Sequence, residues 1–275
     1  MGPRDKVIKA KRPSDPGAAG WDEYAPFYDW ENARTLGRRD VSFWLHAAEQ
    51  VNGLVLELGC GTGRLSLSLA RAGVTLVGVD RSEPMLARAM ARCSRQRRTS
   101  RARGRVTFVR GDIRALPFRS GQFAMVFAPY GVLQSLIRER DLTDTLNAVA
   151  DVLAPGATFG IDLVPDVPNW REYRNRVQMQ GKVGARRLTL IESVRQDRRR
   201  RLTTFEQRYV ERSGRRVVEH RFDLTFRTLP MPLMTRRLER AGFVVDALLG
   251  DYRRGPWTPD ADTWLILARK PRRAR

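Results

Sequence analysis

The sequence predicts an α/β protein with a doubly wound, mostly parallel sheet of seven strands and an antiparallel β insertion before the last helix. Two observations support this fold class. Short, almost continuously apolar segments alternate with helical patterns through the first 163 residues, which is typical of a parallel sheet covered on both faces. From Arg187 to Phe226 the pattern is that of strands without intervening helices, and apolar residues alternate strictly over 218–226, as in a half-buried strand.

The expected elements follow this alternation along the chain. Helices are expected over residues 40–49, 65–72, 82–93, 141–153 and 232–241. The seven strands are expected over residues 54–58, 74–79, 105–110, 122–127, 158–164, 243–249 and 264–268. Ser82 is a suitable N-cap and Pro232 a suitable first-turn residue, while Pro155-Gly156 ends a helix. We therefore expect a disordered basic tail over residues 1–20 and one domain over residues 21–275, with residues 165–230 as an inserted β meander or cap.

Positive charge dominates the composition of the 275 residues. The formal net charge is +21, and residues 91–110 carry eight arginines without an acid. A second cluster comprises Arg195 and residues 198–201. Such surfaces can bind nucleic acid, but a coding preference for arginine over lysine, with the arginines on solvated turns, explains the pattern better. Nucleic acid is therefore a partner that the sequence permits but does not favour.

Several protein classes are disfavoured by what the composition lacks. No apolar run reaches the roughly 18 residues of a membrane helix, and no secretory signal is recognisable. Two cysteines, Cys60 and Cys93, and two histidines, His46 and His220, are too few for a disulfide framework or a zinc site. We expect a cytoplasmic protein with no metal and no membrane partner.

The most informative segment is the glycine-rich stretch over residues 54–64. Gly59, Gly61 and Gly63 alternate between an expected strand and an expected helix, so the chain can turn sharply and a ligand can approach the backbone. A nicotinamide dinucleotide site is disfavoured, because its fingerprint requires glycine where this chain has Arg64. Asp80 closes the second strand, 21 residues after Gly59. An acid there can bind ribose hydroxyls, or it can simply begin a helix.

From about Trp21 onward the chain resembles the class I S-adenosylmethionine-dependent methyltransferases, which have a Rossmann-like fold. The stretch from Glu57 to Gly63 matches the first motif of that family. By this resemblance Asp80 binds ribose, Asp112 accepts a hydrogen bond from the adenine amino group, and Ala128 lies in the motif that faces the methyl group. The resemblance implies S-adenosyl-L-methionine as cofactor and a cofactor site formed by Tyr28, Glu57, Gly59, Cys60, Gly61, Gly63, Arg64, Asp80, Arg81, Met85, Asp112, Ile113 and Ala128.

Residues 24–29 are similar to the cap segment of small-molecule methyltransferases, including sugar N-methyltransferases, in which a tyrosine closes over the cofactor. Helical spacing of the aromatic residues also permits a plain packing role for this segment. The histidine that some relatives place after the fourth strand is absent from residues 131–135. The candidates for catalytic groups are therefore Tyr28, Tyr130 and His220, although His220 suits a packed or interface position better than that of a pocket base.

Three functions remain open. The favoured one is an enzyme that methylates N or O of a small molecule. The alternatives are an RNA or protein methyltransferase that uses the arginine clusters, and a non-catalytic scaffold that binds the cofactor. The intact glycine motif with Asp80 and Asp112 argues against the scaffold. If the protein forms a homodimer, we expect the β insertion to mediate it.

Overall fold

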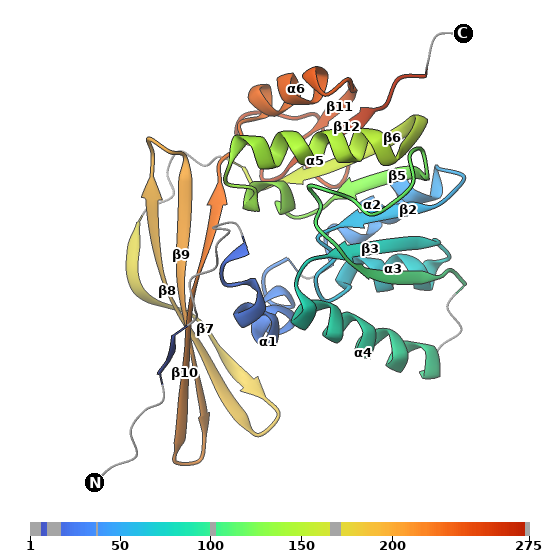
Figure 1. Ribbon diagram of the computed structural model, residues 1–275. Helices are drawn as coiled ribbons and strands as arrows, with labels where there is room; N and C mark the ends of the chain where they lie inside the picture. Colours follow the sequence, from blue (N-terminus) through green and yellow to red (C-terminus); the bar gives the residue numbers. More distant parts are fainter. Residues whose placement is uncertain (1–6, 10–17, 37, 100–102, 166–171, 273–275) are drawn as a thin grey trace. The chain divides into compact units, whose positions relative to one another are not determined.

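The computed structural model describes residues 7–9, 18–36, 38–99, 103–165 and 172–272 (Figure 1). The chain divides into two units, each built on its own sheet. The first unit comprises Met1–Thr35 and Val167–Thr228, and the second comprises Leu36–Asp166 and Leu229–Arg275. The first unit thus joins most of the expected insertion to the segment that precedes residue 36. The expected domain bounds of 21–275 and 165–230 remain predictions.

The second unit contains the predicted seven-stranded sheet. Its order is β11-β12-β6-β5-β2-β3-β4. The pairs β6–β5, β5–β2, β2–β3 and β3–β4 are parallel, whereas β12 runs antiparallel to both of its neighbours. The strands are β2 (Val55–Leu58), β3 (Leu76–Asp80), β4 (Val106–Arg110), β5 (Phe123–Ala128), β6 (Leu153–Leu163), β11 (Val244–Leu249) and β12 (Trp264–Arg269). The predicted fold class is confirmed.

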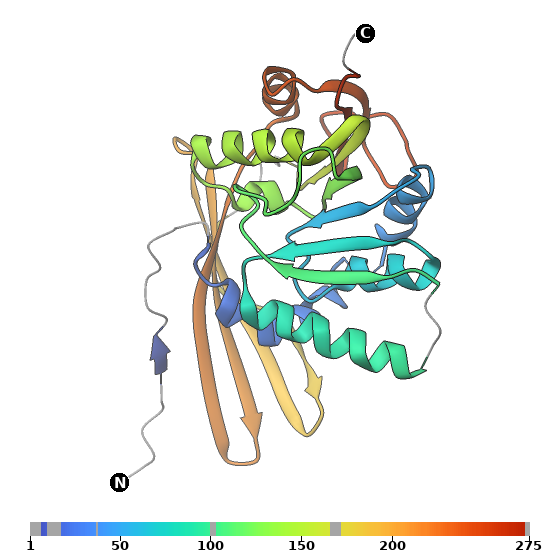
Figure 2. The same ribbon diagram turned by 45° about the vertical axis from the view of Figure 1, so that its right-hand side comes forward.

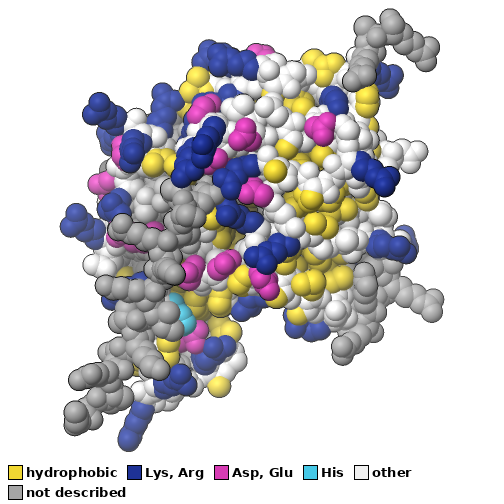
Figure 3. Space-filling view, in the orientation of Figure 1, with side chains coloured by type: hydrophobic (Ala, Val, Ile, Leu, Met, Phe, Trp, Pro, Cys, Tyr) yellow, Lys and Arg dark blue, Asp and Glu magenta, His cyan; other side chains and the backbone are white. Residues whose placement is uncertain are grey.

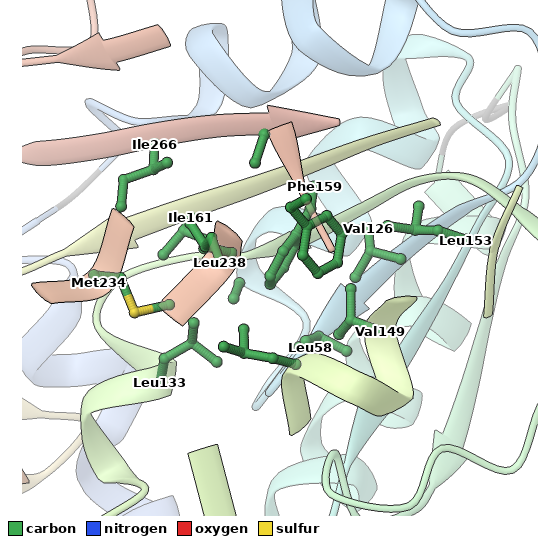
Figure 4. Packing of buried hydrophobic residues seen from close by; sticks show 14 of the residues in the cluster. Leu58, Val126, Leu133, Val149, Leu153, Phe159, Ile161, Met234, Leu238 and Ile266 are labelled. Atoms are coloured by element: carbon green, nitrogen blue, oxygen red, sulfur yellow. The ribbon is translucent and has the colours of Figure 1, made fainter. Parts of the chain in front are cut away.

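Helices cover both faces of this sheet (Figure 2). They are α2 (Val41–Glu49), α3 (Arg64–Ala72), α4 (Glu83–Thr99), α5 (Glu139–Val152), α6 (Met231–Arg240) and the short 3₁₀ helix η2 (Val132–Ser135). One apolar cluster joins the sheet to α5, α6 and η2, and another joins the opposite face to α2 and α3. In the first cluster, Phe159 and Ile161 of β6 pack with Leu238 of α6 and Val149 of α5 (Figure 4). These two cores fix the strand ends that form the candidate site.

Two boundaries in this unit differ from expectation. Helix α4 continues to Thr99, well past the expected end at residue 93, because arginine and glutamine are good helix formers. It therefore includes the start of the arginine run, of which residues 100–102 lie outside the described residues. Strand β6 begins at Leu153, so Pro155-Gly156 lies inside a strand end instead of a loop.

The first unit is a mostly antiparallel sheet with one helix. Its order is β1-β10-β9-β8-β7, and its elements are β1 (Val7–Lys9), α1 (Trp21–Asn32), β7 (Tyr173–Val183), β8 (Arg186–Asp197), β9 (Leu202–Ser213) and β10 (Arg216–Arg227). The antiparallel insertion before the last helix is thus confirmed. Aromatic side chains join α1 to the sheet: the ring of Phe27 stacks on Tyr209 at 4.1 Å between centroids, and Tyr24 lies 5.7 Å from Phe222.

Two features of this unit differ from the sequence-based expectation. Strand β7 precedes the expected start of the β region at Arg187. Its residues are mostly polar and exposed, as suits an edge strand, so no apolar alternation revealed it. Strand β1 lies within the expected disordered tail and pairs in parallel with β10, while residues 1–6 and 10–17 of that tail lie outside the described residues. Among the described helices, none is both long enough and apolar enough to span a membrane.

Candidate functional site

The glycine-rich turn lies where β2 ends and α3 begins. Gly59, Gly61 and Gly63 all have positive φ angles, of 61°, 52° and 75°, which residues with a Cβ rarely adopt. A Cβ at Gly59 would lie 2.1 Å from Cγ2 of Val132. The turn is tied to β3 by a hydrogen bond from the Cys60 N–H to the Val79 carbonyl at 3.0 Å. The backbone thus takes the tight turn that the three glycines predicted.

Glu57 has a structural task beside this turn. Its carboxyl is buried and accepts hydrogen bonds from the hydroxyl and the backbone N–H of Ser66, in the first turn of α3. Burial raises the pKa of Glu57 to about 8, against the lowering effects of Ser66 and the charge of Arg64. Near neutral pH the buried group is therefore largely protonated, and it stabilises amides at the helix N-terminus that have no partner within the helix.

Arg64 is also paired within the protein. Its guanidinium donates to both carboxylate oxygens of Asp40, at 2.6 Å each. The side chain of Asp40 is fully buried and that of Arg64 is 14% exposed. Paired charges at such depth hold α3 against the residue that precedes α2. Asp40 is a site residue that no sequence motif indicates, because the two partners lie 24 residues apart and no local pattern links them.

Cys60 and Met85, two further predicted cofactor-site residues, are buried, as is Ala128 at the end of β5. Burial raises the pKa of the Cys60 thiol well above its ordinary value, so this cysteine is not a thiolate nucleophile. Within the described residues, no group of three or more His, Cys, Asp or Glu side chains could hold a metal ion.

Asp80 joins the glycine turn to the start of α4. One carboxylate oxygen accepts from the Gly61 N–H and the other from the Ser82 N–H, both at 2.8 Å. These amides fix the orientation of the carboxylate at the carboxyl end of β3. In doubly wound sheets, ligands bind outside this end of the strands. Asp80 thus stabilises the glycine turn whether or not it also binds a ligand, and this role has no signal in the sequence.

Asp112 follows β4 and is held by Arg114. The guanidinium of Arg114 bridges both carboxylate oxygens, with its shortest contact at 2.6 Å, and its backbone N–H donates at 2.9 Å. Partial burial raises the pKa of Asp112, but Arg114 and the charge of Arg81 lower it further, so it lies below its ordinary value. Arg81, which follows β3, thus adds to the positive charge around Asp112, which follows β4. Ile113 packs against the core beside them.

One arginine of the basic run supports the glycine turn. Arg92 of α4 donates to the hydroxyl of Thr62 at 3.1 Å and to its carbonyl at 3.3 Å. Thr62 is fully buried within the motif. Arg92 is therefore part of the site's framework, and the expectation that the run consists of solvated charges does not hold for this residue.

Tyr130 follows β5 in an unusual backbone conformation. Its φ is +50° although it is not glycine, and its side chain is 38% exposed. The Tyr130 N–H donates to the carboxyl of Asp162, and the next N–H, of Gly131, donates to the Asp162 carbonyl at 2.8 Å. Residues in such strained conformations concentrate at functional sites. Here the strained conformation is held by the two hydrogen bonds that Tyr130 and Gly131 donate to Asp162 of β6.

Asp162 is the centre of a small buried network that the sequence did not reveal. The hydroxyl of Tyr252 donates to its carboxyl at 2.7 Å. Burial raises the pKa of Asp162 to about 7, although Tyr252 and Tyr130 lower it. Buried Gln134 adds a second link, because its amide bonds both the N–H and the carbonyl of Val164. Together these contacts fix the turn after β5 to the end of β6.

Tyr28 and His220 belong to the first unit, whereas the other predicted site residues belong to the second. The ring of Tyr28 lies 5.4 Å from that of Tyr24 within α1. His220 of β10 is half-buried, 5.1 Å from the ring of Phe27, and its Nε2 lies 3.9 Å from Glu211. These surroundings suit the packing role, and a catalytic role for either residue remains a prediction.

Comparison with known proteins adds a family-level finding. Residues 55–156 match the family model described as a methyltransferase domain. The chain is 33% identical over 170 residues to the demethylmenaquinone methyltransferase of Thermus thermophilus, covering 57% of this chain and 72% of that protein. Two other curated relatives are matched over 53% and 57% of their own length, so the chain spans little more than half of these proteins.

Solved structures resemble the chain over nearly its full length. The methyltransferase CcbJ of Streptomyces caelestis gives a TM-score of 0.75 at 20% identity, covering 94% of this chain and 100% of that one. The sugar N-methyltransferase KedS8 of a Streptoalloteichus species gives 0.73 at 15% identity, covering 99% of each chain. At these identities the likeness shows a shared fold.

Proposed function

Because the chain belongs to the class I S-adenosylmethionine-dependent methyltransferase family, we propose that it transfers a methyl group to a nitrogen or oxygen atom of a small molecule. The predictions of the family, of an enzyme and of S-adenosylmethionine as cofactor are confirmed at the level of family membership. The reaction of the whole protein and its acceptor are our proposal.

The residues of the second unit fit this cofactor. The glycine turn presents backbone N–H groups at the start of α3, where a carboxylate is stabilised. Asp80, whose carboxylate is oriented by two amides, would receive the ribose hydroxyls, and Asp112 would face the adenine. The bound cofactor supplies a methyl group on a sulfonium, which is already activated for transfer.

The remaining task of the protein is to position the acceptor and receive its proton. Alignment with the methyl group and exclusion of water supply most of the rate enhancement in such a reaction. A neutral amine or an easily ionised hydroxyl then needs only a positioned proton acceptor. We propose Tyr130 for the wall that faces the acceptor, because its strained backbone is fixed by Asp162. Tyr28 and His220 remain the candidates from the first unit.

The proposal of a small-molecule acceptor rests mainly on the extent of the structural match. The likeness to the sugar N-methyltransferase KedS8 extends over 99% of both chains and therefore includes β7 to β10. Those strands lie outside residues 55–156, the range that matches the methyltransferase-domain model. This supports a small molecule, with an amine-bearing sugar as one example, over RNA or protein.

Two measurements test this proposal in sequence. S-adenosylmethionine at a hundredfold over its dissociation constant adds about 2.7 kcal/mol of stability. It should raise the melting temperature by roughly 5–10 °C for a protein of this size, whereas NAD should not. Mass spectrometry of compounds that co-purify, followed by transfer of labelled methyl groups to them, then identifies the acceptor. Transfer to RNA or protein instead of any small molecule would refute the acceptor class.

We also propose a cytoplasmic location and, if the protein self-associates, contact through the β insertion. Both cysteines are free thiols, as is usual in a reducing compartment. Within the described residues, β7 pairs with β8 alone, so its second edge is available to another strand. Sedimentation analysis measures the oligomeric state directly.

A further inference from the structure

Two hairpin turns project from the same end of the five-stranded sheet in the first unit. One joins β7 to β8 and the other joins β9 to β10, and both views show them together, opposite the β8–β9 turn (Figures 1 and 2). The register agrees, because Arg187 near the start of β8 pairs with Arg212 near the end of β9. We call residues 182–187 and 212–217 the hairpin end.

Cations form a row across three strands of the hairpin end. Lys182 lies opposite Arg187, and Arg187 lies opposite Arg212. Their side chains therefore lie on one face of the sheet, in which neighbouring strands are about 4.8 Å apart. Like charges directly opposite each other destabilise a sheet. All three residues are exposed, as are Arg215 and Arg216 in the next turn.

No ion pair within the described part of the chain involves Lys182, Arg187, Arg212, Arg215 or Arg216. The neighbouring Arg186 differs, since it pairs with Glu211 at 2.8 Å. Figure 3 shows acidic side chains among the cations over the face in view. The high net charge of the chain therefore does not by itself identify a binding surface. The hairpin end is distinguished by a row of cations that the fold places together without acids.

Each hairpin also exposes a valine beside these cations. Val183 is 36% exposed and Val217 is 37% exposed, and Val217 continues the row, opposite Arg212. The β8–β9 turn at the other end differs, because residues 197–201 include four arginines and no apolar residue. Cations with adjacent apolar side chains are the composition of surfaces that lie in a membrane interface.

We propose that the hairpin end docks on an anionic phospholipid surface. Its cations would lie beside headgroup phosphates, and its two valines would enter the interface. Nucleic acid offers the phosphates but no apolar phase, and residues 182–187 and 212–217 contain no aromatic side chain that could stack on bases. The expectation of no membrane partner rested on the lack of a spanning segment, which surface docking does not need.

Co-sedimentation of the full chain with vesicles tests this proposal. One set contains phosphatidylcholine alone and the other about one third phosphatidylglycerol. The variant Lys182→Glu/Arg187→Glu/Arg212→Glu reverses the row. The control Arg198→Glu/Arg199→Glu/Arg200→Glu changes the net charge equally, at the opposite end of the sheet. We expect binding to the anionic vesicles alone, weakened about a hundredfold or more by the first variant, and several-fold at most by the control.

A second pair of measurements separates a lipid surface from a polyanion. Val183→Ser/Val217→Ser keeps every charge, so it should weaken vesicle binding and leave binding to a single-stranded RNA oligonucleotide unchanged. Equal losses in the two charge variants, no loss in the valine variant, or no vesicle binding by the unmodified protein would each overturn the proposal. Circular dichroism verifies folding, and the matching glutamine triple variants replace any glutamate variant that does not fold.

Discussion

Replacing Glu57 with glutamine should remove a large part of the pH dependence of stability. Glutamine has the shape of the protonated acid and keeps an acceptor for Ser66. Burial raises the pKa of Glu57 from an ordinary 4.5 to about 8, so the folded state retains a proton that the unfolded chain releases. A raised pKa stabilises the fold at low pH, and that stability is lost as pH rises through about 8.

The magnitude follows from the interval between the two pKa values. Each pKa unit corresponds to about 1.4 kcal/mol, so between about pH 5.5 and 8.5 Glu57 should lower the free energy of unfolding by about 3 kcal/mol. Asp162, with a pKa raised from 3.8 to about 7, should contribute about 2 kcal/mol over the same interval, complete near pH 7.

Urea unfolding at several pH values measures this effect. The stability advantage of Glu57→Gln over the unmodified protein should grow by about 3 kcal/mol between pH 5.5 and pH 8.5. Asp162→Asn is the matched control, because it removes only the share of Asp162, which ends near pH 7, and leaves the decline due to Glu57, which continues to about pH 8. If Glu57→Gln retained the full decline in stability, the carboxyl of Glu57 would be ionised in the folded protein and our account of its burial would be wrong.

Three further changes test the site. Asp80→Ala should weaken S-adenosylmethionine binding in calorimetry by on the order of 1.5–3 kcal/mol per lost hydrogen bond; unchanged affinity would limit Asp80 to its contacts with Gly61 and Ser82. Gly59→Ala should destabilise the protein by about 1–3 kcal/mol more than Gly184→Ala. Gly184 is the control because its φ of +60° is nearly the same, but no atom lies within 4 Å of a Cβ added there. Equal melting temperatures of the two variants would exclude the clash with Val132. Reversal of Arg97, Arg98, Arg101 and Arg103 to glutamate should preserve methyl transfer to a small molecule, whereas an RNA acceptor would lose binding and turnover together, with a smaller dependence of affinity on salt.

Local signals in the sequence account for most of the second unit. The strands from β2 to β5 are short apolar runs bounded by turns. The glycine motif forms a tight turn with positive φ angles at its three glycines, as alternating glycines predict. Strand β7 lacked such a signal, because an edge strand with both faces largely exposed needs no alternation of apolar residues. Its place in the sheet depends on pairing with β8, which a single-residue pattern does not encode.

The site residues that the sequence missed have non-local partners. Arg64 and Asp40 are 24 residues apart, and Tyr252 and Asp162 are 90 residues apart. No local pattern marked Asp40, Asp162 or Tyr252 as a site residue in its own segment. The Tyr252–Asp162 pair depends on where β6 and the segment after β11 come together, and the Arg64–Asp40 pair depends on how α2 and α3 pack.

The order in which the chain is synthesised has a consequence for the first unit. Its helix α1 ends at Asn32, but its sheet partners Tyr209 and Phe222 emerge from the ribosome almost two hundred residues later. At about 5–20 residues per second, the aromatic side chains of α1 wait on the order of ten seconds or more without the surface that buries them. During that interval they are available to chaperones or to non-native contacts. Folding of this unit therefore depends on how well the nascent helix is protected, and slower translation lengthens its exposure.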